Sequence, residues 1–557
     1  MSVKKLVFLL IVGVLLAAIG SIMFPVIDYV IKEEIKKKVV ISNTSETYDV
    51  WQDIPIPVYM QFYIFNVLNS EEIQNGEKPA VEQLGPYTYI ERRTKFDIVW
   101  NENGTVTYKQ TRTFHFVPEM SAGNETDLIT TINPIIAVLA QSLRWLPEIV
   151  KEVISRVLEL TPNEDLFMTR PVKEVLWGYE DPSLTLLNSL LPTWFSRTVI
   201  GYFIRKNFTD DGVYTVYTGE TDANLVGEIE KYNGDSSVNI WSTEWANMVN
   251  GSDGTLNPPF GFDEEYSHVF VSDICRSIRG KYKTDVTIPQ GIKLRRFGGD
   301  QNDMKNATLN PDNIGFCTPN TSCLPTGLLN STLCQEPVDG FALPIIFSFP
   351  HFLYADPEVQ ESVDGLEPNE WEHQTVIDAE PWTGFVLRVA KRLQINIFVE
   401  PIAGIKQTHN IRKLYFPVVW LNESSATDDK HADLLIDQLF TPLEITNIVK
   451  ITLVCLGGVW VLVTSGLLIH GCWQNRGYND DEDDETDGIR SPPRSHDPVT
   501  DPILPSSGSG NFSRIPGPSR GDSSVTSSTS GQRSSGMSKD QVVKNERTPI
   551  LGSNLDV

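Results

Sequence analysis

Two long apolar runs, one near each end of the chain, dominate its pattern of hydrophobic and polar positions. The first covers 6–27 and the second covers 451–469. At about 1.5 Å per residue, the 22 residues of the first run form a helix about 33 Å long, enough to cross the ~30 Å hydrocarbon core of a bilayer. We therefore predict transmembrane helices at 6–27 and 448–472. A cleaved signal peptide is the alternative for the first run, which is longer than a usual signal core.

Small residues recur at every fourth position of the first run, at Gly13, Ala17 and Ser21. They share one face of the predicted helix, and a face of small residues lets a second helix approach closely. A homo-oligomer is one expectation for this chain. The alternative is that these small residues are incidental.

The segment between the two runs predicts one large domain at 28–447. Its alternating patterns predict β-strands at 58–67, 105–117 and 212–218. Glycine and proline interrupt the pattern often, as turns do. The segment is long enough to bury a large hydrophobic core.

The clearest helix is predicted at 146–160, where the apolar positions recur at helical spacing. Its apolar stripe consists of Leu146, Ile149, Val150, Val153, Ile154, Val157 and Leu158. Its polar face consists of Lys151, Glu152, Ser155, Arg156 and Glu159. We predict that the stripe packs on the core of its own domain, with the polar face in solvent. A helix that docks a partner protein is the alternative.

Nine glycosylation sequons, each Asn-x-Ser/Thr without an intervening proline, lie between the two apolar runs. They start at Asn43, Asn103, Asn124, Asn207, Asn250, Asn306, Asn320, Asn330 and Asn422. Glycans are added on the luminal side and need a wet surface, so the sequons place the segment between the runs in the lumen. This orientation makes the N-terminus (1–5) and the tail (473–557) cytoplasmic.

Four of the six cysteines, Cys275, Cys317, Cys323 and Cys334, fall in the predicted luminal segment. An even number in an oxidising compartment predicts two disulfides, and spacing alone leaves all three pairings open. Cys472 lies at the cytoplasmic edge of the second span, where palmitoylation is one prediction and an unmodified thiol is the other.

The composition excludes several classes of function. A net charge of −26 disfavours nucleic-acid binding. The chain contains no HExxH, G-x-S-x-G or Walker sequence, and its luminal histidines are scattered. We therefore predict no catalytic residue, metal site or cofactor, and interpret the chain as a non-enzyme. A membrane-anchored ectoenzyme and an adhesion or structural coat protein are the alternatives from other classes.

The segment after the second apolar run is rich in acidic residues and then in Ser, Pro, Gly and Thr, which predicts a disordered tail at 473–557. Glu546 stands four positions before the aliphatic pair Ile550 and Leu551. This spacing is the pattern that clathrin adaptors bind in endosomal or lysosomal sorting. The last residues, 555–557, also fit a PDZ groove as an added strand.

Ordered motifs over about 1–475 resemble the class B scavenger receptors. Trp51 is followed by IPVYMQFYIFNV (56–67), GPYTY (85–89), LWGY (176–179), NGSDG (250–254), SDICRS (272–277), SFPHF (348–352), GLEPN (365–369) and RLQIN (392–396). The resemblance implies an α+β fold: a large luminal antiparallel β-barrel-like ectodomain with an apical helical bundle, held by two transmembrane helices. It also implies an internal apolar tunnel that accepts cholesterol, phospholipid or fatty acid. Movement inside such a tunnel avoids exposing acyl chains to water, which costs about 0.8 kcal/mol per methylene.

The cysteine pattern is similar to that of the lysosomal member of the family. Cell-surface members usually carry a further pair of cysteines, and Gly315 and Ala246 occupy those two positions here. The pairing that the resemblance implies is Cys275–Cys334 and Cys317–Cys323. It also implies that Glu546, Ile550 and Leu551 form a lysosomal sorting signal.

The helix at 146–160 corresponds to the apical helix by which the lysosomal member binds its cargo, the hydrolase β-glucocerebrosidase. We expect any luminal partner to dock on this helix, on the face that includes Lys151 and Arg156. The relative has a histidine near the start of its helix, whereas this chain has Arg144 there. Because arginine keeps its charge in acid, the resemblance does not carry over a histidine-based release of cargo.

The sequence thus predicts a lysosomal or late-endosomal glycoprotein that binds and transports lipids and serves as a sorting receptor for a luminal hydrolase. A plasma-membrane scavenger receptor for lipoproteins or phosphatidylserine-bearing particles is the alternative.

Overall fold

The computed structural model describes residues 2–161, 165–190, 192, 196–318, 322–335 and 343–482. The chain divides into two units, Met1–Tyr478 and Asn479–Val557. The described part of the second unit is the last turn of a helix that begins in the first. The description below concerns the first unit.

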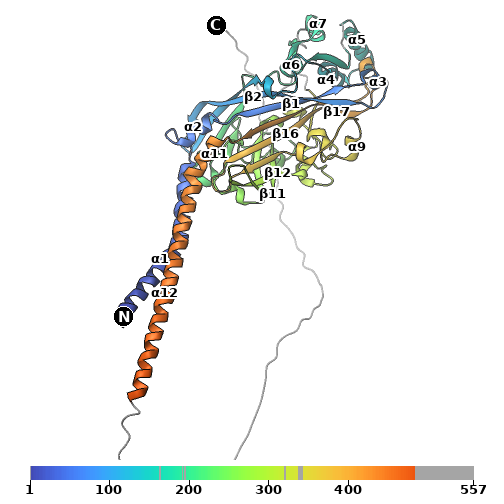
Figure 1. Cartoon of the computed structure of the whole chain (residues 1–557). Helices are drawn as coiled ribbons and strands as arrows, with labels where there is room; N and C mark the ends of the chain where they lie inside the picture. The colour runs from blue at the N-terminus through green and yellow to red at the C-terminus, as the bar shows by residue number, and fades with distance from the viewer. Residues whose placement is uncertain are drawn as a thin grey trace, which may run out of the picture. The chain divides into compact units, whose positions relative to one another are not determined.

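A long helix stands at each end of this unit (Figure 1), and each contains one of the predicted apolar runs. Helix α1 covers Val3–Lys38, and α12 covers Thr441–Glu482 after the short helix α11 (Asp429–Leu435) and a π-helical turn (Ile436–Phe440). Both are long and apolar enough to cross a membrane. Most of their large apolar side chains are exposed, which suits a lipid environment and not water.

Helices α1 and α12 pack closely where glycines replace side chains. A Cβ on Gly13 would lie 3.0–3.2 Å from Trp460 and Val461, and one on Gly20 would lie 2.8–3.1 Å from Leu453 and Val454. The contact face on α1 therefore runs through Gly13 and Gly20. Ser21, which the sequence placed on this face, is exposed instead. The small-residue face is thus occupied by the second long helix of the same chain.

A buried charge joins the two helices near the sheet. Lys450 of α12 is 2% exposed, and its Nζ lies 2.9 Å from Oδ1 of Asp28 on α1. The ammonium also lies 5.0 Å from the ring centroid of Phe24. Such a pair fixes the register of two helices, because sliding either helix leaves the buried lysine without its partner.

A 13-stranded antiparallel sheet forms the body of the unit. Its strands are β1 (Val58–Val67), β2 (Val81–Trp100), β3 (Thr105–Phe116), β8 (Thr209–Tyr217), β9 (Ile229–Tyr232), β10 (Tyr266–Val271), β11 (Arg276–Thr287), β12 (Lys293–Gly299), β13 (Leu329–Asn330), β14 (Ile345–Ser348), β15 (Val376–Ala379), β16 (Val386–Val399) and β17 (Leu414–Ala426). The three strands predicted from alternation correspond to β1, β3 and β8, so these predictions are confirmed.

The main path of the sheet runs β10-β11-β12-β15-β16-β17-β1-β2-β3-β8-β9. Ser252 forms one bridge with Glu228, next to β9, and another with Val269 on β10. The amide of Phe270 donates to the carbonyl of Ser252 at 2.9 Å. One short segment therefore links the two edge strands, which satisfies backbone groups that an open sheet would leave unpaired.

Short helices gather at the end of the sheet away from α1 and α12 (Figure 1). They are α4 (Pro134–Leu143), α5 (Glu148–Glu159), α6 (Val172–Trp177) and α7 (Pro182–Leu190), with the two-stranded pairs β4 (Leu128–Ile132) with β5 (Phe167–Pro171) and β6 (Tyr179–Glu180) with β7 (Val199–Ile200) among them. Helices α2 (Glu46–Gln52), α3 (Ser70–Gln74), α8 (Glu244–Asn247), α9 (Pro357–Gln360) and α10 (Glu370–His373) lie in loops.

The largest hydrophobic clusters divide the interior. One joins α4 to β1, β2, β16 and β17, and includes Phe62, Tyr89 and Ile136. The other lies where the long helices meet the sheet, and includes Ile35, Trp51 and Tyr108. The observed fold is therefore α+β, with a large antiparallel sheet between two long apolar terminal helices that pack together.

Two stacked histidines lie buried beside β17. The rings of His351 and His373 have centroids 4.3 Å apart and an interplanar angle of 10°. Each Nδ1 accepts a backbone N–H at 3.0 Å, from Glu367 and Asn369 respectively. Each imidazole is therefore neutral. Burial lowers the pKa of His351 to about 3 and that of His373 to about 4, with the neighbouring His373 and Arg392 adding to the two effects.

This pair predicts a loss of stability in acid. The unfolded histidines bind protons below pH ~6.5, whereas the folded ones do so only below about 4 and about 3. Between these values the unfolded state holds more protons, so stability falls as the pH falls, by about 1–2 kcal/mol per imidazole from pH 7 to pH 5. Chemical unfolding of the detergent-solubilised chain at both pH values measures this change.

The double variant His351→Gln/His373→Gln should lose less stability between pH 7 and pH 5 than the wild type, whatever its stability at pH 7. The exposed His115 provides the control, since His115→Gln should retain the wild-type dependence. An unaltered pH dependence in the double variant would contradict this account.

Candidate functional site

A cavity of about 1350 Å³ lies against the short helices α4 and α7 and extends along β8. Helices α4 and α7, strand β7 and the start of β8 contribute to its wall, as does the disulfide Cys275–Cys334. Ordinary small-molecule pockets measure ~300–1,000 Å³. The cavity is therefore large enough for a bulky ligand.

The wall of the cavity changes from apolar to charged. Ile135, Val138 and Leu139 of α4 line it together with Leu184 of α7. Its polar lining residues include Thr111, Lys206, Asp210, Asp211 and Ser272. A cavity with these two kinds of wall suits an amphiphilic occupant, because its apolar part and its polar part both find matching surfaces.

The charged wall belongs to a larger group of buried and half-buried charges inside the sheet. We call it the charged layer, and its members are Glu91, Arg93, Lys95, Arg112, Lys206, Asp211, Asp253, Asp273, Lys391 and Glu423. Five members are cationic and five are anionic, so the layer carries no formal net charge.

The strand registers place this layer between the two hydrophobic clusters. On β3, the inward positions read Phe114, Arg112, Gln110 and Tyr108, all buried. Phe114 belongs to the cluster near α4, and Tyr108 belongs to the cluster near the long helices. On β16 and β17, Leu393 and Leu421 of the first cluster are likewise followed two residues away by Lys391 and Glu423.

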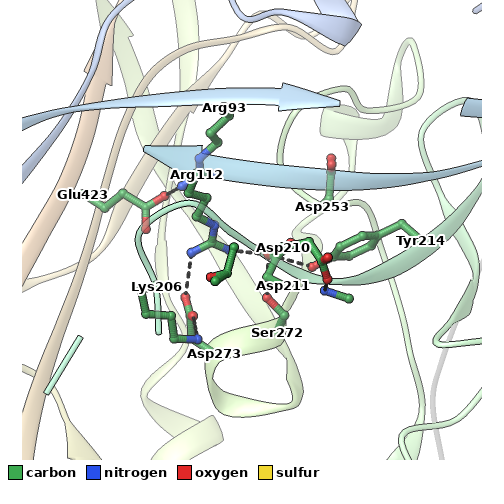
Figure 2. A network of polar contacts seen from close by, with 12 residues as sticks. Arg93, Arg112, Lys206, Asp210, Asp211, Tyr214, Asp253, Ser272, Asp273 and Glu423 are labelled. Carbon is green, nitrogen blue, oxygen red and sulfur yellow. Dashed lines mark hydrogen bonds and ion pairs between the residues drawn. The ribbon is translucent and has the colours of Figure 1, made fainter. Parts of the chain in front are cut away.

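Asp273 connects charged residues from different parts of the sheet (Figure 2). It follows β10 in a single turn, η4 (Ser272–Ile274), and meets three cations, two of which, Lys206 and Arg112, are labelled in Figure 2. Its carboxylate oxygens lie 3.0 Å from Nζ of Lys206, 3.1 Å from Nζ of Lys391 and 3.5 Å from Nη1 of Arg112. Strand β16, strand β3 and the segment before β8 are thereby joined to the turn after β10, which is the strand at one edge of the sheet.

Further pairs extend the layer along the strands. Arg112 also pairs with Asp211, whose carboxylate accepts hydrogen bonds from Ser272 and Tyr214 at 3.0 Å each. Glu423 pairs with Arg93 and with Lys391, the latter at 3.0 Å. Figure 2 shows Arg93 with Glu423, and Arg112 beside Asp211 and Asp273.

The last pair of the layer meets the aromatic cluster near the long helices. Nζ of Lys95, a residue 1% exposed, lies 3.7 Å from Oδ2 of Asp253 and donates to the carbonyl of Trp51 at 3.0 Å. The same ammonium lies 5.1 Å and 5.2 Å from the ring centroids of Trp51 and Tyr108. Burial lowers the pKa of Lys95, and the cation relies on these partners.

Neighbouring cations keep the central carboxylate ionised. Burial alone would raise the pKa of Asp273, but Lys206, Arg112 and Lys391 outweigh it and hold that pKa well below its usual value. Removing one partner of a buried ion pair typically costs about 3–5 kcal/mol, because an uncompensated charge remains. The layer is therefore stable only while its charges stay paired.

Helix α5 confirms the helix predicted at 146–160 but not its predicted orientation. Ile149 is 71% exposed and Val153 is 58% exposed, whereas Lys151 is 7% exposed. Val150 and Arg156 are also exposed, Leu146 and Ile154 are half-buried, and only Leu158 of the apolar stripe is fully buried. The prediction that the stripe packs on the core is therefore confirmed for Leu146, Ile154, Val157 and Leu158 and wrong for Ile149, Val150 and Val153. The use of Lys151 as an exposed docking residue is also wrong.

The orientation of α5 follows from polar contacts with the loop before β17. Oγ of Ser155 bonds to the side chain of Gln407 at 2.9 Å and accepts the amide of Lys406 at 3.0 Å. Gly404 leaves room for the helix, since a Cβ there would lie 3.0 Å from the carbonyl oxygen of Glu148. These partners lie some 250 residues further along the chain, so helical periodicity gives no sign of them.

Arg144, which precedes α5, is held by a carboxylate. Its Nη1 lies 2.8 Å from Oε1 of Glu400. Its guanidinium also stacks over Trp145, which is 83% exposed. Trp145, just before α5, thus adds to the exposed apolar surface at the start of this helix.

The structure contains two disulfides, Cys275–Cys334 and Cys317–Cys323, the pairing that the resemblance implies. The two positions without cysteine lie against each other, and a Cβ on Gly315 would lie 2.6 Å from Cβ of Ala246. The chain is thus packed too tightly there for side chains at both positions without rearrangement.

The remaining predicted sites lie on the surface or outside the described residues. Asn43, Asn103 and Asn124 are exposed, and Asn207, Asn250, Asn306, Asn330 and Asn422 are half-buried, so none of the sequon asparagines that the structure describes is buried. Cys472 is an exposed free thiol on α12. Asn320, Glu546, Ile550, Leu551 and the tail from 483 onward lie outside the described residues. Within the described ranges, no group of three His, Cys, Asp or Glu side chains is arranged to hold a metal.

Comparison with known proteins identifies the family. The sequence profile of the CD36 family matches residues 11–468. Lysosome membrane protein 2 of Homo sapiens is 37% identical over 461 residues, which cover 82% of this chain and 93% of that protein. Scavenger receptor class B member 1 of Cricetulus griseus is 35% identical over 455 residues, which cover 81% of this chain and 87% of that protein. These relatives are named as a membrane protein and a receptor, not as enzymes, and the chain belongs to the CD36 family, the class B scavenger receptors.

Proposed function

We propose that this protein is a membrane glycoprotein of late endosomes or lysosomes that binds lipids and transports them toward the membrane. The observation that carries this proposal is the large cavity beneath the short helices, with its apolar wall and its charged end. Cholesterol, phospholipid and fatty acid are its proposed ligands, since each has a large apolar part and a polar group. Similarity to lysosome membrane protein 2 supports the compartment.

The proposed topology has both termini in the cytoplasm. Segments 6–27 and 448–472 span the bilayer, 28–447 is luminal, and 1–5 and 473–557 are cytoplasmic. The pairing of α1 with α12 supports two adjacent spans. The exposed or half-buried position of the described sequon asparagines supports a glycosylated luminal side.

The sheet is proposed to act as a barrel-like wall around an apolar tunnel. Support comes from Ser252, which bridges toward both edge strands, and from the strand faces that turn inward. The cavity would be the apical end of this tunnel, and the aromatic cluster around Trp51 would be its membrane end.

A luminal hydrolase is the proposed protein partner, docked on α5. The face now proposed is the exposed apolar one, defined by Trp145, Ile149, Val150, Val153 and Leu160. Aromatic and aliphatic residues grouped on an exposed helix are typical of a partner-binding surface. Clathrin adaptors are the proposed partners of the tail.

A plasma-membrane scavenger receptor is the second candidate. Its support is the 35% identity to scavenger receptor class B member 1 over 81% of this chain. Lipid binding in the cavity is common to both candidates, so the destination of the protein distinguishes them.

The cavity can be tested by filling it. Val238 and Ile240 line the cavity and are half-buried, so Val238→Trp or Ile240→Trp should reduce the lipid that copurifies with the full chain severalfold. Lipid extraction and mass spectrometry measure this amount. Val99 is 57% exposed and does not line the cavity, so Val99→Trp should retain the wild-type amount. Equal lipid in all four proteins would contradict binding in the cavity.

The face of α5 can be tested with charged substitutions. Ile149→Glu/Val153→Glu should weaken binding of β-glucocerebrosidase at least tenfold, since a charge in an apolar interface must be desolvated. Surface plasmon resonance with the solubilised chain measures the affinity. Arg156→Glu, on the exposed polar side of the same helix, should have a much smaller effect. The opposite ranking of the two variants would assign docking to the polar side.

The tail determines the destination of the protein. Ile550→Ala/Leu551→Ala should move most of the protein from lysosomes to the cell surface, because the adaptor loses both aliphatic contacts. Leu555→Ala/Val557→Ala is the matched control and should remain lysosomal. Surface biotinylation measures both. Lysosomal retention of the first variant would remove the proposed sorting role of this signal, and a wild-type protein found mainly at the cell surface would favour the second candidate.

A further inference from the structure

We propose that the charged layer is a gate: it confines a bound lipid to the apical cavity, and its ion pairs must separate before the lipid reaches the membrane end of the interior. This inference rests on the proposed function, since it concerns the path that a lipid takes after binding.

The charged layer lies directly against the cavity. Lys206, Asp211 and Ser272 line the cavity, so an occupant of the cavity meets the layer directly. On β3, Arg112 and the buried Gln110 separate Phe114, of the cluster near α4, from Tyr108, of the cluster near the long helices. An acyl chain that continued inward along this strand would have to pass two consecutive polar positions.

The ion pairs of the charged layer share residues and so form one connected set. Asp273 meets Lys206, Lys391 and Arg112 within 3.0–3.5 Å, so it links β3 and β16 across the interior. Lys391 also lies 3.0 Å from Glu423, and Glu423 pairs with Arg93. Arg93 in turn lies 2.7 Å from Glu91. A chain that crosses this connected set has to come between charges that are now in contact.

Separating the ion pairs of the layer costs free energy, but the charged groups can exchange partners. The five cations and five anions compensate one another, so a methylene chain between them would leave opposite charges apart in an interior of low polarity. Among the described residues, Glu91 Oε2, Arg112 Nε and Asp211 Oδ1 have no hydrogen-bond partner. These atoms give the layer unused capacity to exchange partners while a lipid passes.

The gate is tested by removing one cation and one anion that are in contact. Lys391→Met/Glu423→Gln keeps side-chain size and net charge, leaves Arg93 with Glu91, and leaves Asp273 with Lys206 and Arg112. The control Lys281→Met/Glu265→Gln removes an exposed pair, whose side chains are 41% and 62% exposed and whose charged atoms lie 3.3 Å apart.

The full chain is reconstituted in phosphatidylcholine vesicles, and BODIPY-labelled cholesterol is supplied on its large-domain side from cyclodextrin. Both the label bound at equilibrium and its rate of transfer into the bilayer are measured. We expect Lys391→Met/Glu423→Gln to bind the wild-type amount and to transfer roughly tenfold faster, the factor that about 1.4 kcal/mol of barrier represents. The control pair should match the wild type in both.

The outcomes separate the gate from the proposed function. Binding with an unchanged or slower transfer rate in a folded Lys391→Met/Glu423→Gln protein would overturn the gate and leave lipid binding intact. Absence of binding by the wild type would overturn lipid binding itself, and the gate with it. If Lys391→Met/Glu423→Gln fails to fold, Lys95→Met/Asp253→Asn at the membrane side of the layer gives the same reading, because the side-chain amide introduced by Asp253→Asn keeps an oxygen that can accept the hydroxyl of Tyr108.

Discussion

Paired charges inside the sheet determine how the interior of this protein is divided. Asp273 meets cations from three elements, and these contacts join the edge near β10 to β3 and β16. Apolar side chains lie on both sides of this group, in one cluster near α4 and another near the long helices. Because a buried charge is tolerated only beside its partner, the strands that carry these charges are held in one arrangement. The cavity adjoins that arrangement at Lys206 and Asp211, and the two long helices meet the sheet beyond the second cluster.

The two long helices give the domain its second constraint. Gly13 and Gly20 let α12 approach α1 closely. Lys450 of α12 pairs with Asp28 of α1 in the part of the helix pair that is closer to the sheet. The register of the two helices is therefore fixed both by the close packing at the glycines and by this ion pair. The aromatic cluster around Trp51 includes Ile35 of α1 and Leu439 of the turn before α12, so the sheet is seated directly on this helix pair. The two long helices thus support one end of the domain. The short helices α4 and α7, which line the cavity, lie at the other end.

Local pattern predicted the elements of the fold better than it predicted their surroundings. The apolar runs, the strands β1, β3 and β8 and the helix α5 follow from residue spacing, which is a property of neighbouring positions. The orientation of α5 depends on Ser155 meeting Gln407, a contact between distant segments, and periodicity assigned the wrong face. The charged layer was missed for the same reason, since its members come from separate segments. One signal was present: Glu91, Arg93 and Lys95 continue the inward face of Tyr87 and Tyr89 on β2, at a spacing of two residues.

The measurement that tests this account most directly is an experimental structure of the full chain with lipid bound. The account predicts lipid density along α4 and α7 that ends at Lys206 and Asp211, with the contacts of Asp273 intact. Continuous acyl-chain density from the cavity to the cluster around Trp51, beside an undisturbed charged layer, would contradict it.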